Sequence, residues 1–300
     1  MTTTSNMARG SGPEELQARP GILEVISNFV VRQPLGAFGA FIVLGIVMMG
    51  ILAPFLSAHD PLHVAFENML MPPGSEFFLG TDQFGRDILT RLLYGSRTAL
   101  FVGFTAAFVG SSIGLVLGVT SAYIGGRFDL VFQRVMDLFQ SFPLIIMALA
   151  IVSIFGPNLQ NVIVAITIPF IPDCARVVRS SALTIREIPY IDAARANGFS
   201  NTRIVLRHMV PNVMAPYLIM FTTFVGHAIL LEASLSYLGL GVQEPTPSWG
   251  LMLQGGAEEY AESAPWVAIW PGVAISLAVF GFNMFGDAVR DMLDPKLRSQ

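Results

Sequence analysis

The chain has 300 residues, of which 53% are hydrophobic and only 13% are charged, and its mean hydropathy is +0.62. Soluble globular domains carry about 25% charged residues, so this composition excludes an ordinary soluble domain and indicates a protein of the lipid bilayer. The formal net charge of −4 is not that of a nucleic-acid-binding protein, which normally has a basic face. The single cysteine, Cys174, excludes an intramolecular disulfide and a site with several thiolate ligands.

Several long stretches of the chain contain no Asp, Glu, Lys or Arg, and each could supply the roughly 20 apolar residues that cross a 30 Å hydrocarbon core. They are 33–59, 98–126, 138–172, 208–231 and 263–286. The third would extend about 52 Å as one helix, and Gly156-Pro157-Asn158 near its middle predicts a turn. Two helices, 139–155 and about 160–180, therefore replace it, and the sequence predicts an all-α fold with six transmembrane helices.

The distribution of basic residues predicts the orientation of these helices, because Lys and Arg accumulate in cytoplasmic loops. With six crossings and the N-terminus inside, 14 of the 17 basic residues are cytoplasmic, and six of them follow from Arg176 to Arg207. A five-helix arrangement places at most 12 of the 17 on one side. We therefore expect both termini in the cytoplasm, with Asp173, Arg176 and Arg179 at the inner end of the fourth helix.

The chain is expected to divide into two tails, a first helix, a loop and a core. The segments are a cytoplasmic N-terminal tail 1–36, a first transmembrane anchor 37–56, an external loop 57–97, a core 98–287 with five transmembrane helices, and a cytoplasmic C-terminal tail 288–300. The N-terminal tail is polar and has no early apolar core, so we interpret it as a tail and not as a cleaved signal peptide. Trp249, Trp266 and Trp270 lie in or beside the outer segment that precedes the last helix, which suits an interfacial aromatic belt.

Missing motifs exclude several kinds of chemistry. The only lysine is Lys296, which Leu297 follows, so the chain lacks the Lys-Ser or Lys-Thr of a phosphate-binding Walker A loop. No H-E-x-x-H and no G-x-S-x-G is present, and we expect no catalytic residues. His59 and His63 have i, i+4 spacing, but Pro61 lies between them and no carboxylate completes a metal site. An ordinary polar loop is the favoured interpretation, with no metal or other cofactor bound by this chain.

Two ionisable residues belong to the fifth predicted helix or its outer end. His227 and Glu232 are either pathway residues or groups whose hydrogen bonds are satisfied by neighbouring helices, and we favour the second interpretation because a neutral imidazole is the least costly ionisable group to place in a bilayer. In the second helix, Gly110, Gly114 and Gly118 recur every four residues. This spacing puts small residues on one face and predicts close packing against another helix.

The cytoplasmic segment 182–211 carries clear helix signals. Pro189 suits the first turn of a helix, and Gly198 is placed to end it in a left-handed conformation. Ser200 can then cap a second short helix over 201–209. The two helices would form a compact projection below the membrane, although an amphipathic helix held on anionic headgroups by its arginines has a similar pattern.

This segment resembles the EAA loop of the permeases of ABC importers, in which Glu-Ala-Ala and Gly are followed at a fixed distance by Ile-x-Leu-Pro. Here Asp192-Ala193-Ala194 and Gly198 precede Pro211, which opens the fifth predicted helix. Asp192, His208 and Val210 depart from that pattern. The string Arg207-His208-Met209-Val210-Pro211-Asn212 is similar to the ending found in the dipeptide and oligopeptide branch of the family.

Eight further segments, in the same order along the chain, are similar to the C-type subunit of that branch. They are Leu79-Gly80-Thr81-Asp82, Gly85-Arg86-Asp87, Tyr123-Ile124-Gly125-Gly126, Asp137 with Ser141-Phe142-Pro143, Ala175-Arg176-Val177-Val178-Arg179, 232–241, Pro247-Ser248-Trp249-Gly250, and Gly286-Asp287 through Asp294-Pro295. The resemblance therefore covers about 79–295.

The resemblance implies the type I permease bundle of an ATP-driven, binding-protein-dependent importer of di- or oligopeptides in a bacterial cytoplasmic (inner) membrane. Such a subunit forms half of the translocation pathway beside a second, homologous permease. Two cytoplasmic ATPases that bind ATP and Mg and an external solute-binding protein complete the assembly. Importers of nickel, opines, glutathione or antimicrobial peptides remain alternatives of the same class, and a stand-alone secondary carrier or channel is the alternative of another class.

The resemblance also implies that the projection inserts into a groove of one ATPase. We hypothesise that Asp192 and nearby arginines position it, while Ala193, Ala194 and Gly198 permit close approach. The residues assigned to this coupling are Tyr190, Asp192, Ala193, Ala194, Gly198, Arg207, His208 and Pro211. Those assigned to the pathway or to contact with the binding protein are His227, Glu232, Trp249, Glu258 and Glu259, of which the last two belong to the segment 242–265 without Lys or Arg.

Overall fold

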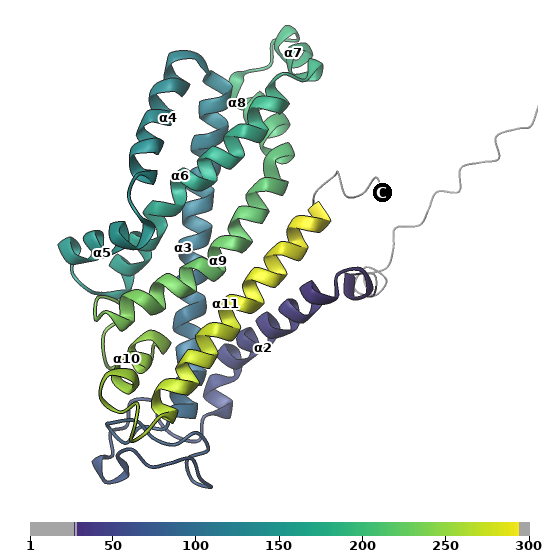
Figure 1. Ribbon diagram of the computed structural model, residues 1–300. Helices are drawn as coiled ribbons and strands as arrows, with labels where there is room; N and C mark the ends of the chain where they lie inside the picture. Colours follow the sequence, from purple (N-terminus) through teal and green to yellow (C-terminus); the bar gives the residue numbers. More distant parts are fainter. Residues whose placement is uncertain (1–26, 28, 294–300) are drawn as a thin grey trace, which may run out of the picture.

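A computed structural model describes residues 27 and 29–293, and within them the chain forms a bundle of helices without any named strand (Figure 1). Among the residues that the structure describes, five helices are long and apolar enough to cross a bilayer. They are α2 (Pro34–Leu56), α3 (Ile88–Ile124), α6 (Leu159–Arg186), α9 (Met214–Tyr237) and α11 (Trp266–Leu293). The prediction of an all-α, polytopic membrane protein is confirmed. Most of the predicted tail 1–36 and the end of the tail 288–300 lie outside the described residues.

The third predicted crossing, 139–155, is wrong as a single straight helix. Its residues divide between α4 (Gly126–Gln140) and α5 (Leu144–Phe155), which are bent by 84° relative to each other. Pro143 precedes α5 and disfavours a helical conformation of the residue before it. The 12 residues of α5 extend about 18 Å, too short for a 30 Å core. Only the bent pair as a whole can serve as a sixth span.

Helix α3 begins earlier than predicted because Asp87 caps it. The Asp87 carboxylate accepts hydrogen bonds from the Thr90 backbone N–H at 3.0 Å and from the Thr90 hydroxyl at 2.7 Å, which satisfies a free N–H at the start of the helix. The predicted external loop 57–97 therefore ends at residue 87. Arg91, which we placed in that loop, belongs to the first turn of α3.

Helix α6 extends beyond its predicted end and changes the position of its polar residues. The helix continues to Arg186, whose Nη1 donates a hydrogen bond to the Ala122 carbonyl of α3 at 2.8 Å. Asp173 and Arg176 consequently lie near the middle of α6 and not at its inner end. The first charged residues after the apolar stretch therefore do not mark the end of this helix.

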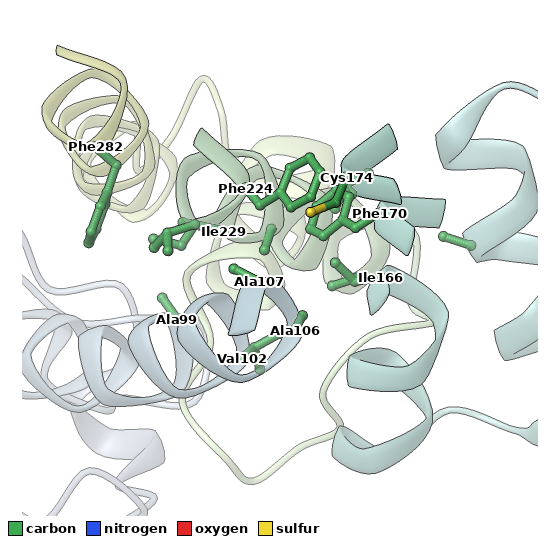
Figure 2. Close-up of a cluster of buried hydrophobic side chains, with 14 of the residues drawn as sticks. Ala99, Val102, Ala106, Ala107, Ile166, Phe170, Cys174, Phe224, Ile229 and Phe282 are labelled. Atoms are coloured by element: carbon green, nitrogen blue, oxygen red, sulfur yellow. The ribbon is translucent and has the colours of Figure 1, made fainter. Parts of the chain in front are cut away.

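The centre of the bundle is a close contact between α3 and α6. A Cβ atom added to Gly114 would lie 2.6 Å from the Cβ of Cys174, and Gly110 and Gly118 also face α6. Figure 2 shows Phe170 of α6 beside Phe224 of α9 in this core, where their rings stack with centroids 4.2 Å apart and planes 8° apart. Small residues on α3 thus allow the two backbones to approach, and aromatic rings fill the space beside them.

The two ends of the bundle differ in structure. We call the helical connection 187–213 between α6 and α9 the knob, and Figure 1 shows its helix α7 at the end opposite to α10. The knob contains α7 (Pro189–Ala196), α8 (Asn201–Ile204), a π-helical turn (Val205–Met209) and a 3-10 turn (Val210–Val213). The loop end consists of the loop 57–87 with its 3-10 turn (Phe66–Asn68), the connection 238–248 and α10 (Trp249–Glu259). The chain therefore separates the segments that we predicted to lie on opposite sides of the membrane.

We predict that Gly114→Ala destabilises the protein whereas Gly45→Ala does not. The added methyl group would overlap Cys174 in the first case, while a Cβ on Gly45 in α2 would meet nothing within 4 Å. Overpacking of this kind costs about 1–3 kcal/mol, and an exposed helical alanine is favoured over glycine by about 1 kcal/mol. Unfolding curves in detergent measure the difference. Equal transition midpoints for the two variants would contradict the close α3–α6 contact.

Candidate functional site

One face of α7 is anchored in the bundle and the other is free. The Ile191 and Ala194 side chains are buried, whereas Asp192, Ala193 and Arg195 are exposed. Arg195 donates a hydrogen bond to the Asp192 carboxylate at 3.0 Å, one helical turn away. Our hypothesis that Ala194 permits close approach of a partner is wrong, because this residue packs inward. The surface that can meet a partner consists of the other two motif residues, Asp192 and Ala193, together with Arg195.

Gly198 ends α7 in the predicted left-handed conformation. Its φ angle is +74°, a conformation that side chains disfavour. The Gly198 amide donates to the Arg195 carbonyl at 2.9 Å, and the Phe199 amide donates to the Ala194 carbonyl at 3.2 Å, which closes the end of the helix. A Cβ on Gly198 would meet no atom of this chain within 4 Å. Backbone conformation, and not close packing within the chain, requires glycine here.

Hydrogen bonds join α7 to the segment that leads into α9. The Tyr190 hydroxyl donates to the His208 carbonyl at 3.1 Å and accepts from Asn212 Nδ2 at 3.2 Å. Asn212 Nδ2 also donates to the His208 carbonyl at 2.6 Å. Of the other residues assigned to coupling, Arg207 and Pro211 are exposed and His208 is half-buried beside the rings of Tyr190 and Phe199.

Pro211, which we predicted to open the fifth transmembrane helix, does not separate two helices. Ser200 caps the second short helix as predicted, but the helical path then continues through 205–213 into α9. Pro211 is the second residue of the 3-10 turn, where a missing N–H is tolerated. A displacement of α7 can therefore be transmitted directly to α9.

The knob also contacts the other central helices. Near the end of α3, the Tyr123 hydroxyl donates to Asn201 Oδ1 at 2.7 Å, and the Arg195 guanidinium lies 5.5 Å from the centre of the Tyr123 ring. The knob continues α6 at Glu187. It is thus connected to α3, α6 and α9, so a displacement of the knob can be transmitted to all three helices.

Sequence reasoning did not identify an ionic network at the loop end, in which the Arg86 and Arg91 side chains are buried and that of Glu244 is 41% exposed. Arg86 donates to Asp82 at 2.7 Å and, through both terminal nitrogens, to the two oxygens of Glu244 at 2.8 and 3.1 Å. Arg91, whose side chain is fully buried, donates to the Pro61 carbonyl at 3.1 Å and to Glu244 at 3.4 Å. These bonds fasten the loop 57–87 to the connection after α9. The only sequence signal was the motif around Asp82 and Arg86, and nothing in one sequence pairs it with Glu244, which lies 158 residues from Arg86.

The charge of Glu244 depends on this network. Burial opposes ionisation of the carboxyl, but hydrogen bonds from Arg86 and the positive charges of Arg91 and Arg86 outweigh that effect, so the pKa of Glu244 lies below its ordinary value. Glu244 is therefore a carboxylate at neutral pH, and both arginines keep their counter-ion.

The remaining candidate residues fall into an internal and an exposed group. Trp249 is buried and its indole donates to the Leu92 carbonyl at 3.0 Å. Glu232 is buried and accepts hydrogen bonds from the hydroxyls of Ser236 and Ser248, both at 2.8 Å. The assignment of these two residues to the pathway or to a binding protein is wrong, and so is the place of Trp249 in an interfacial belt. The favoured interpretation of Glu232 as a group with satisfied hydrogen bonds agrees with this geometry, although its partners lie on its own helix and just before α10 and not on neighbouring helices. The same interpretation of His227 is wrong, because this side chain is exposed and makes no hydrogen bond to another described residue.

The exposed group consists of three residues that remain accessible to a ligand or partner. Glu258 and Glu259 lie at the end of α10, where they line a cavity of about 440 Å³ together with Glu244. His227 is exposed on α9 and lines a different cavity on the side of the bundle. Among the described residues, no group of three or more His, Cys, Asp or Glu side chains could hold a metal ion.

We predict that acidification loosens the loop end through Glu244. Because the folded pKa is depressed, the stabilisation is fully present above the unfolded pKa of about 4.3 and is lost as the pH falls through the folded pKa. The hydrogen-exchange protection factors of the loop 57–87, which correct each amide for its pH-dependent intrinsic rate, should therefore fall from pH 6 to pH 3 in the wild type. Glu244→Gln should show low protection factors already at pH 6 and a weaker pH dependence. Glu262→Gln, which changes an exposed carboxylate of the same region, should behave as the wild type; if it abolished the pH dependence, the network would not be its source.

Curated relatives match nearly the whole chain. A dipeptide transport system permease protein, DppC, of Alkalihalophilus pseudofirmus is 42% identical and covers 89% of this chain and 88% of its own length. The di/tripeptide permease DppC of Pseudomonas aeruginosa is 38% identical, with coverages of 88% and 89%. The glutathione transport system permease protein GsiD of Shigella flexneri is 40% identical, with coverages of 89% and 88%.

Solved structures support the same fold. The permease fold of the MetNI methionine ABC transporter in an inward-facing conformation matches with a TM-score of 0.55 at 23% identity, covering 68% of this chain and 96% of that chain. A family model described as the inner membrane component of binding-protein-dependent transport systems matches residues 110–299, which include α6, the knob, α9 and α11. The chain belongs to this family of binding-protein-dependent transport permeases.

Proposed function

We propose that this chain is a permease subunit of an ATP-driven importer of di- or oligopeptides. The observation that carries the proposal is the knob, whose exposed face of Asp192, Ala193 and Arg195 is joined by hydrogen bonds and continuous helix to α3, α6 and α9. A chain that lacks a Walker A loop needs energy from a partner. The knob is connected to the three central helices, so a partner that binds and displaces the knob can also displace these helices.

The mechanism follows from this connection. Two ATPase subunits bind ATP and Mg, and their closure displaces the knob together with the ends of α3, α6 and α9. The displacement shifts the equilibrium between inward-open and outward-open arrangements of the bundle. ATP binding therefore changes the accessibility of a pathway that this chain forms together with a second, homologous permease.

The loop end is the surface for an external solute-binding protein. The exposed Glu258 and Glu259 favour a partner with a complementary basic face, since charge complementarity speeds docking. The Arg86–Glu244 pair holds the surrounding loops in place for this contact. In this arrangement the protein lies in a bacterial inner membrane with the knob and both termini in the cytoplasm. The permease pair is a heterodimer, and this chain binds no cofactor itself.

Peptides are the substrates favoured by the relatives, of which two named above are dipeptide or di/tripeptide permeases. Glutathione is a second candidate, because the Shigella flexneri relative is a glutathione permease of similar identity. Both substrates have a free ammonium group and free carboxylates. The ligand of the co-assembling binding protein distinguishes them.

We predict that a tag on this chain isolates a complex with a second permease and two ATPase chains. In proteoliposomes that also contain the binding protein, the complex should take up radiolabelled dialanine in an ATP-dependent manner. ATP-dependent uptake of radiolabelled glutathione by a complex that takes up no dialanine would support the second candidate. Isolation of a homomer that transports without an ATPase would contradict the proposed function.

We predict that Gly198→Val uncouples ATP hydrolysis from transport. A β-branched residue in the left-handed conformation is strained by about 1–3 kcal/mol, and relief of that strain changes the end of α7. A coupling loss of about 1–3 kcal/mol corresponds to roughly 5- to 150-fold fewer peptides transported per ATP hydrolysed. Gly126→Val is the matched control, because Gly126 also has a positive φ and open space around it but is the first residue of α4 and lies outside the knob. If both variants lose coupling equally, the knob has no special role.

A further inference from the structure

A cavity of about 650 Å³ opens on the side of the bundle, where the α4–α5 bend meets α6 and α9. Its polar lining consists of Gln140, Asp173, Arg176, Thr223 and His227. Apolar side chains that include Met147, Met220 and Phe224 complete the wall. Phe224 also stacks on Phe170 in the core (Figure 2), so the floor of the cavity is supported by the rigid centre of the molecule.

The polar residues of this cavity lie far from the ends of their helices. Asp173 and Arg176 are near the middle of α6, and His227 is near the middle of α9. Charged side chains within a membrane-spanning helix are costly, and they usually face the bundle interior or a water-filled cavity. Asp173, Arg176 and His227 follow this rule, since their side chains line the cavity.

Hydrogen bonds hold the charged side chains in place, but some of their donor and acceptor atoms remain available to a ligand. Asp173 accepts a hydrogen bond from Gln140 at 2.6 Å, and Arg176 donates one to Asp137 at 2.6 Å. The side chain of Arg176 is 49% exposed, and a guanidinium has five N–H donors. His227 makes no hydrogen bond to any other described residue. One carboxylate, one guanidinium and one imidazole are thus presented to the same space.

We propose that this cavity binds the charged ends of a peptide during translocation, with Asp173 receiving the α-ammonium group and Arg176 and His227 receiving the α-carboxylate. The proposal rests on the proposed function and names the part of the substrate that is recognised. Every free peptide carries these two ends, whatever its side chains. Met147 and Met220 suit variable side chains, because methionine is flexible and polarisable. The volume lies within the range of about 300–1,000 Å³ for small-molecule sites.

The first test locates the peptide without relying on transport rates. The probe is a dipeptide whose side chain carries a benzophenone, which reacts with nearby methionine. It is irradiated with the complete importer during turnover, and the residues of this chain that become labelled are identified by mass spectrometry. We expect labelling of Met147 and Met220 that excess dialanine suppresses. Met48, an exposed residue of α2, reports reaction from the lipid phase. Labelling of Met48 that equals or exceeds that of the cavity methionines, or labelling that dialanine does not suppress, would overturn the proposal.

The second test uses two arginines that share one partner. Both Arg176 and Arg134 pair with Asp137, at 2.6 and 3.7 Å, but only Arg176 lines the cavity. We expect R176Q to raise the KM for dialanine transport at least about tenfold, as the loss of a charge-assisted hydrogen bond implies, and R134Q to change it less than about twofold. R176K, which keeps the positive charge, should recover part of the loss.

The outcomes separate the inference from the function on which it rests. Equal KM values for R176Q and R134Q, in an importer whose wild type transports dialanine, overturn the peptide site and leave the importer function intact. If the wild-type complex transports neither dialanine nor glutathione, the proposed function itself is contradicted.

Discussion

The close approach of the α3 and α6 backbones is the constraint on which the rest of the structure depends. Gly110, Gly114 and Gly118 leave no room for side chains between the two helices, so the relative position of α3 and α6 is set by backbone contact. Each functional region is attached to this pair. Asp87 and Arg91 at the start of α3 hold the loop end, Tyr123 near its end holds the knob, and the middle of α6 supplies two charged residues to the lateral cavity.

Polar groups are few in this chain, and their placement divides them into two kinds. The carboxylates of Glu232 and Asp82 are enclosed and bonded to hydroxyl or guanidinium groups of the same chain, and they stabilise loops and helix ends. Asp173, Arg176 and His227 are open to a cavity, and Asp192 and Arg195 are open on the knob. Of these two kinds, only the second is accessible to substrates and other subunits in this conformation of the chain.

The sequence sufficed for the helical class, the membrane location and the position of the knob, because each depends on local signals. Runs without charge reveal spans, and Pro189 and Gly198 reveal the limits of α7. The bend between α4 and α5 was missed because α4 contains Asp129, Arg134 and Asp137, whose charges resemble those of a loop when their partners are unknown. The Arg86–Glu244 pair and the lateral cavity join residues far apart in the sequence, and such contacts have no signature in a single chain.

Helix α4 is attached to the bundle through polar bonds to α6 and α3. Three residues on one face of α6, Asp173, Arg176 and Arg179, bond to Gln140, Asp137 and Asp129 of α4. The Arg176–Asp137 pair is about half exposed and the Arg179–Asp129 pair is largely enclosed, whereas the α3–α6 contact is close-packed. One wall of the lateral cavity is therefore held by polar bonds, while the opposite wall belongs to the close-packed core.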